Sequence, residues 1–197
     1  MNRARRAASG LAARAAALAL VCAPGFAGAA PYAIDPTHSS VYFDLPTPGF
    51  VSTQHGRLDR TRGAVEYDRL GRSASVEVRL ATASVSTGVA ALDRRLCAPD
   101  ALDCDAHPQA VFRAAQFAFD DSGRPTRVQG ELTLRGQTRP LTLRALRFTC
   151  YPNPILLREV CGGDFDAEIE PAAFGIATGA GVPGLVRLHV QVEAIKQ

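Results

Sequence analysis

The sequence predicts an all-β protein, a single eight-stranded antiparallel barrel with one short helical insertion. Apolar and polar residues alternate with a two-residue period in segment after segment, as in half-buried strands. Turn residues, with glycine prominent among them, separate these segments. No internal repeat, linker or shift in composition divides the chain. We therefore expect one closed or nearly closed sheet around one core.

The clearest element is a β-hairpin centred on Gly136. In its first strand, Val128, Leu132 and Leu134 share one face and polar residues occupy the other. A turn with glycine at Gly136 follows, and a second strand occupies residues 141–148. The alternation on both sides of a glycine turn is typical of a hairpin.

Five further segments show the same alternation, at residues 39–44, 58–68, 74–80, 164–170 and 186–194. A sixth expected strand, at residues 111–119, is less regular. The segment at 141–148 changes parity, because Ala145 and Leu146 fall on opposite faces of a regular strand. A β-bulge or burial of both faces explains this change, and the sequence is compatible with either.

One segment, residues 87–104, departs from the β pattern. Val89, Leu92 and Leu96 recur at helical spacing, and Pro99 then ends the helical pattern. We expect this insertion to cover or plug one end of the sheet.

The first 29 residues resemble a signal peptide. Basic residues precede a short apolar run at 15–21, and Ala27-Gly28-Ala29 forms a cleavage motif. The run is too short to span a bilayer, so we expect no stable membrane insertion. Cys22 raises lipidation as an alternative, which the bulky Val21 before it disfavours. A periplasmic or secreted protein with one domain at residues 30–197 is predicted.

The net charge gives no support to nucleic-acid binding. The chain has 22 Lys and Arg against 19 Asp and Glu. Four of the arginines precede residue 15, so 18 basic residues face 19 acidic ones after cleavage. The apparent basicity therefore belongs to the leader.

Four cysteines follow the leader, namely Cys97, Cys104, Cys150 and Cys161. An even number in an oxidising compartment favours two disulfides. Of three connectivities we favour Cys97 with Cys104 and Cys150 with Cys161, because each pair brackets a short loop. Zinc binding by Cys97, Cys104 and His107 lacks both a C-x-x-C motif and a fourth ligand, so no metal is expected.

The motif at residues 130–143, G-x-L-T-L-x-G-x-T-x-P-L-x-L, resembles the signature hairpin of the YceI-like family. These are secreted lipocalin-like barrels associated with polyisoprenoid binding. Further motifs similar to those of the family occur at residues 32–43, at residues 107–112 directly after the helical insertion, and at the Phe174-Gly175-Ile176 corner. The resemblance spans residues 32–195. Residues 102–105 and 171–173 depart from the family pattern, and the departure at 102–105, in the helical insertion, concerns the mouth of the barrel.

The resemblance implies a polyisoprenoid or quinone-type lipid as ligand, with no cofactor. Small inward residues leave volume in an eight-stranded barrel, which permits a cavity. The expected ligand-binding residues are Phe43, Phe50, Val78, Leu80, Phe112, Leu132, Leu134, Phe165, Phe174 and Leu188. A filled barrel that acts through loops such as 151–160 remains the alternative. Arg94 and Arg95 would meet a polar head group or form a solvated helix face, and a homodimer is left open.

We expect no enzymatic activity and no catalytic residue. Asp35, His38 and Ser39 are residue types of a catalytic triad, but neighbouring strand residues point to opposite faces. The hydroxyl of Ser39 therefore cannot reach the imidazole of His38, and no G-x-S-x-G motif is present. We expect His38 to hydrogen-bond backbone where the chain enters the barrel.

Overall fold

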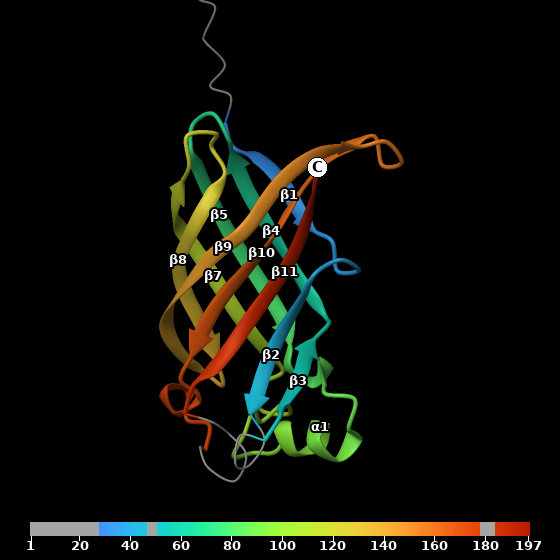
Figure 1. The fold of residues 1–197 in the computed structure, drawn as a ribbon, viewed down its shortest axis with the longest axis vertical. Helices are drawn as coiled ribbons and strands as arrows, with labels where there is room; N and C mark the ends of the chain where they lie inside the picture. The colour runs from blue at the N-terminus through green and yellow to red at the C-terminus, as the bar shows by residue number, and fades with distance from the viewer. Residues whose placement is uncertain (1–27, 47–50, 178–183) are drawn as a thin grey trace, which may run out of the picture.

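A computed structural model describes residues 28–46, 51–177 and 184–197. These residues form one antiparallel sheet of eleven strands and one α-helix (Figure 1). The strands are β1 (Ala30–Ile34), β2 (Ser40–Pro46), β3 (Thr53–Leu58), β4 (Thr61–Asp68), β5 (Ser73–Ala81), β6 (Val85–Ser86), β7 (Gln109–Phe119), β8 (Pro125–Leu134), β9 (Gln137–Asn153), β10 (Arg158–Ile169) and β11 (Val186–Lys196). The helix is α1 (Ala90–Leu96), and two 3-10 turns are η2 (Thr82–Ser84) and η3 (Pro171–Phe174). The predicted leader falls almost wholly outside the described residues.

Eight strands close into a ring and confirm the predicted barrel. Their order is β1, β4, β5, β7, β8, β9, β10 and β11, and β11 pairs back with β1. Ile34 lies opposite Ala194 at this closure. Every pairing around the ring is antiparallel, and the closure of β11 on β1 leaves the ring without a free edge.

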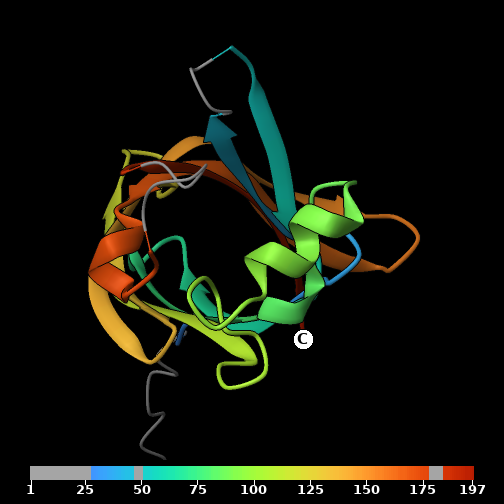
Figure 2. The ribbon, with the colours of Figure 1, turned by 90° about the horizontal axis from the view of Figure 1, so that it is seen from below.

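Three short strands extend the sheet at the lower end of Figure 1. One half of β11 pairs with β1 and the other half with β2, because a turn at Asp35 separates β1 from β2. The Asp35 carboxylate accepts a hydrogen bond from the backbone N–H of Thr37 in this turn. Next, β2 pairs with β3 and β3 with β6, so the β2–β3 hairpin projects from the ring (Figure 2). These three strands raise the number from eight in the ring to eleven in the whole sheet.

A β-bulge explains the parity change in β9. Arg147 lies opposite Asp164 and Ala145 opposite Phe165, which leaves Leu146 without a partner on β10. Leu146 is 59% exposed, so its side chain points outward. The bulge, and not burial of both faces, returns Phe148 to the inner face.

The helical insertion lies at the lower end of the barrel, beside the β2–β3 hairpin (Figure 2). The Asp93 carboxylate accepts hydrogen bonds from the N–H and hydroxyl of Thr87, which ties α1 to the preceding chain. Leu92 and Leu96 pack against the barrel core. Val89, expected on the same face, is instead half exposed, because the helix begins only after it.

Both predicted disulfides form. Cys97 and Cys104 close the loop after α1, with Cα atoms 5.0 Å apart. Cys150 and Cys161 lie directly opposite each other on β9 and β10. One therefore fixes the insertion, and the other joins the two strands of the long hairpin.

No helix in the described parts of the chain is both long and apolar enough to cross a bilayer.

Candidate ligand-binding cavity

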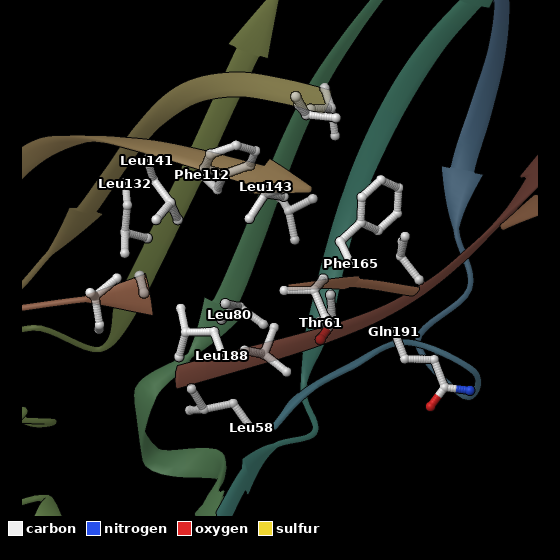
Figure 3. A pocket seen from close by; sticks show the side chains of 18 of the residues that line it. Leu58, Thr61, Leu80, Phe112, Leu132, Leu141, Leu143, Phe165, Leu188 and Gln191 are labelled. Carbon is white, nitrogen blue, oxygen red and sulfur yellow. The ribbon is translucent and has the colours of Figure 1, made fainter. Parts of the chain in front are cut away.

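The barrel contains an interior cavity of about 240 Å³. Side chains from all eight strands of the ring line it, and its accessible wall consists of apolar atoms. Figure 3 shows leucines from several strands converging on it, with Phe112 and Phe165 among them.

Small inward residues create this volume. The inner face of β5 presents Val76 and Val78, and that of β7 presents Ala110. Across the β5–β7 pair, Ala110 lies opposite Leu80. Short side chains at these positions do not reach the barrel axis, so the larger side chains of other strands leave a void between them.

Aromatic rings close the upper end of the cavity. The ring centroid of Tyr67 lies 5.7 Å from that of Phe148, 6.3 Å from that of Tyr32 and 6.5 Å from that of Phe119. The hydroxyl of Tyr67 donates to the carbonyl of Gly123 at 2.7 Å. These contacts fill the space at this end and satisfy its polar atoms.

The Tyr32 hydroxyl leads away from the cavity toward the surface. It donates to the Glu159 carboxylate at 2.5 Å, and Arg69 and Lys196 lie 3.9 Å from the same carboxylate. Burial raises the pKa of Tyr32, and the hydrogen bond and negative charge of Glu159 raise it further. The hydroxyl is therefore a proton donor throughout the physiological range.

Besides β2 and β3, two non-strand segments outside the ring line the lower end. The insertion contributes Leu96, Ala101 and Leu102, and the segment around η3 contributes Pro171 and Ile176. Their positions agree with the expectation that the insertion covers one end of the barrel.

A family model described as the YceI-like domain matches residues 32–194. The chain belongs to the YceI-like family. Protein YceI of Shigella flexneri is 31% identical over 182 residues, which cover 90% of this chain and 93% of that protein.

Solved structures of two other proteins share the fold of this YceI-like chain. BcnA of Burkholderia cenocepacia superposes with a TM-score of 0.65 at 20% identity, covering 81% of this chain and 98% of that one. A domain of Saccharophagus degradans, described as polyisoprenoid binding and implicated in plant cell wall breakdown, gives a TM-score of 0.59 at 15% identity. That match covers 84% of this chain and 98% of the domain.

Eight of the ten residues expected to bind ligand line the cavity of this YceI-like barrel. They are Phe43, Val78, Leu80, Phe112, Leu132, Leu134, Phe165 and Leu188. Phe174 lies elsewhere: it is buried in η3, just before Gly175, and borders an outer groove with Arg135 instead of the cavity. Phe50 lies outside the described residues.

The sequence analysis missed Tyr32, Tyr67 and Thr61 as lining residues. Along β4, Thr61, Val65 and Tyr67 share one parity and line the cavity. This alternation was the available signal. Polar atoms on these side chains hid it, because tyrosine and threonine are less often buried than leucine or valine.

No charged side chain lines the cavity in the parts of the chain that the structure describes. Arg94 and Arg95 are exposed on α1, and Arg95 pairs with Asp100 at 2.6 Å. Neither arginine therefore faces a ligand in the cavity. The amide of Gln191 lies at the margin of the cavity, on an exposed side chain.

The side chains of Asp35, His38 and Ser39 do not form a triad. The Ser39 hydroxyl accepts from the N–H of Glu193 at 3.1 Å, whereas exposed His38 points to Asp35 at 2.8 Å. The expectation that the His38 side chain hydrogen-bonds the backbone was wrong, because its Nδ1 atom pairs with the Asp35 carboxylate in the same turn. The hydrogen bond to Asp35 raises the pKa of His38.

The one cluster of metal-ligand type found in the described residues contains Cys150, Glu159 and Cys161. Its two sulfur atoms are joined to each other, so they are not available as thiolate ligands.

Proposed function

We propose that this protein is an exported, non-enzymatic carrier that holds a long-chain apolar lipid, of polyisoprenoid or quinone type, inside its barrel. The observation that carries the proposal is the cavity of about 240 Å³ with an apolar wall. Binding is driven by the removal of apolar surface from water, roughly 25 cal/mol per Å² before the costs of association.

The size of the cavity defines what enters it. It exceeds the roughly 150 Å³ of an engineered apolar cavity that stays dry and binds benzene. It is smaller than the roughly 300–1,000 Å³ of sites for drug-sized ligands. The cavity therefore takes part of a prenyl chain as it stands, and a whole chain requires the wall to expand.

Two further observations support the proposal. The Saccharophagus degradans domain with the same fold is described as polyisoprenoid binding. The two disulfides fit a protein that works in an oxidising compartment, as the leader-like first 29 residues predict.

A cavity-filling substitution tests the proposal. Ala110 on β7 is 3% exposed and lines the cavity, so Ala110→Phe places a ring in the space that a ligand would occupy. Ala118→Phe, on an exposed alanine of the same strand, is the matched control. We expect the wild type and Ala118→Phe to bind a polyprenol in a fluorescent-probe displacement assay and Ala110→Phe to lose binding. Equal binding by all three proteins would exclude the cavity as the site.

A second function, docking to another molecule through the β9–β10 hairpin, is favoured by one observation. At the tip of this hairpin, which projects from the barrel in Figure 1, Ile155 is 89% and Leu157 87% exposed. Asn153 holds the tip by accepting hydrogen bonds from the N–H groups of Ile155 and Leu156. Replacing Ile155 and Leu157 by serine separates the two functions, since lipid binding should persist while docking is lost.

A further inference from the structure

One residue that lines the cavity carries a buried polar atom with no partner. Thr61, the first residue of β4, is 3% exposed and lines the cavity. Its hydroxyl oxygen is buried and makes no hydrogen bond to the protein. Buried polar groups nearly always have a partner, so an orphaned hydroxyl requires an explanation.

The other buried hydroxyls of the barrel are satisfied. Thr82 donates to the carbonyl of His107 at 2.7 Å, and Tyr67 donates to the carbonyl of Gly123. Ser39 exchanges hydrogen bonds with the backbone of Glu193. Thr61 differs from these three because its buried hydroxyl oxygen makes no hydrogen bond.

A bound water does not account for the missing partner of the Thr61 hydroxyl. A buried water needs two to four polar partners, as a rule, to be held in place. The side chain directly opposite Thr61 on β5 is Leu80, which offers neither a donor nor an acceptor, and the accessible wall formed by the other lining side chains, some of them labelled in Figure 3, is apolar. A water beside Thr61 would therefore have a single partner among these side chains.

We propose that Thr61 determines ligand specificity by hydrogen-bonding one neutral oxygen, a hydroxyl or a carbonyl, on an otherwise apolar isoprenoid ligand. This inference rests on the proposed function. The accessible wall is apolar, so the Thr61 oxygen does not face the empty cavity. Ligand binding requires a change of rotamer, because rotation about the one bond between the backbone and the hydroxyl group turns the oxygen toward the ligand. An alcohol both donates and accepts, and a quinone carbonyl accepts from the hydroxyl.

The same geometry selects against an anionic head group beside Thr61. A charge is buried only when it is paired, and no charged side chain lines the cavity in the described residues. A phosphate-bearing lipid would therefore leave its phosphate outside the cavity, beyond the reach of Thr61.

The test compares farnesol with farnesene, a hydrocarbon of similar size without the hydroxyl. Each is titrated into the wild type and into Thr61→Val, which keeps the shape and removes the oxygen, with displacement of N-phenylnaphthylamine as readout. We expect the wild type to bind farnesol roughly 3- to 10-fold more tightly than farnesene, the worth of one neutral hydrogen bond. In Thr61→Val this preference should vanish while farnesene still binds.

Thr82→Val is the matched control, because the same substitution removes a satisfied hydroxyl outside the cavity. It should keep the preference for farnesol and lower the Tm by about 2–4 °C, whereas Thr61→Val should leave the Tm unchanged or raise it. If Thr61→Val retains the farnesol preference, or loses Tm as Thr82→Val does, the role of Thr61 is overturned while the carrier function stands. If the wild type binds neither compound, the carrier function fails, and the inference fails with it.

Discussion

The upper end and the middle of the barrel use the same strands in opposite ways. At the upper end, Tyr32 and Tyr67 pack with Phe119 and Phe148, and both hydroxyls have hydrogen-bond acceptors. In the middle, aliphatic side chains and phenylalanines such as Phe112 and Phe165 surround a void, and the hydroxyl of Thr61 has no acceptor. Strand β4 runs through both regions, with Tyr67 in one and Thr61 in the other.

The size of the inward side chain makes the difference. Large rings that meet across the barrel axis form a packed core, and this core stabilises the folded state. Short side chains leave space that only a ligand fills. Substitutions should therefore affect stability most at the upper end and ligand affinity most in the middle.

The largest effect is expected for Tyr67→Ala. Removing this ring opens a cavity among three other aromatic side chains, so we expect a loss of about 3–5 kcal/mol in the free energy of unfolding, measured in guanidinium chloride. Tyr67→Phe, which removes only the hydroxyl, should cost about 1 kcal/mol. A loss below 1 kcal/mol for Tyr67→Ala would mean that the upper end is not a packed core.

The disulfide between β9 and β10 comes next. Replacing Cys150 and Cys161 together by alanine should lower the free energy of unfolding by about 2–3 kcal/mol, because the unfolded chain gains freedom in the loop that the bond closes. The same double replacement at Cys97 and Cys104, which close a shorter loop, should cost slightly less. The reverse order in equilibrium unfolding would contradict this loop argument.

A smaller loss of stability is expected in the middle of the barrel. Leu80 faces the void on one side, so Leu80→Ala should cost about 2 kcal/mol, the low end of the range for such truncations. Affinity for a polyprenol should fall in the same variant, since apolar wall is lost. If stability falls as far as in Tyr67→Ala while affinity is unchanged, Leu80 belongs to a packed core and not to a binding site.

The smallest effect concerns the turn before β2. Burial acts to raise the pKa of Asp35, but hydrogen bonds from His38 and Thr37 outweigh it and lower that pKa, while Asp35 raises the pKa of His38. The stability that the raised pKa of His38 contributes is fully present below about pH 6.5 and is lost as pH rises through its folded-state pKa. The stability that the lowered pKa of Asp35 contributes is present above about pH 4 and is lost as pH falls through its folded-state pKa.

We therefore expect His38→Gln to cost most between about pH 4 and 6.5. His38 is 62% exposed, so solvent screens the pair and the loss should be only a few tenths of a kcal/mol. Thermal unfolding at pH 5 and pH 8 measures it, with the wild type at both values as the reference. A loss of equal size at both pH values would show that the charge of His38 plays no part.

Much of the fold follows from local sequence pattern, and the exceptions have physical causes. Alternation in the segment at 186–194 predicts β11, since a strand with one buried face has a two-residue period. The sequence did not distinguish a bulge at Leu146 from burial of both faces, because the bulge depends on how β9 pairs with β10, where Ala145 lies opposite Phe165. The alternating segments did not include β1, which a turn with side-chain hydrogen bonds at Asp35 separates from β2.

The cavity was harder to predict than the barrel. Parity places Leu80 and Leu188 on the inner face, but it does not say whether facing side chains meet or leave a void. Thr61 was missed because its chemistry becomes informative only once the partners around it are known. Phe174 was misplaced because a residue in a 3-10 turn has no strand parity to follow.

Native mass spectrometry of the purified protein, followed by organic extraction of whatever remains bound, tests the central claim most directly. The apolar cavity predicts one equivalent of an isoprenoid or quinone-type lipid, or its uptake when a polyprenol is added. It also predicts that the added mass is absent from Ala110→Phe and retained by Ala118→Phe. A protein that stays ligand-free after incubation with these lipids would contradict the carrier account and leave the barrel as a scaffold for its loops.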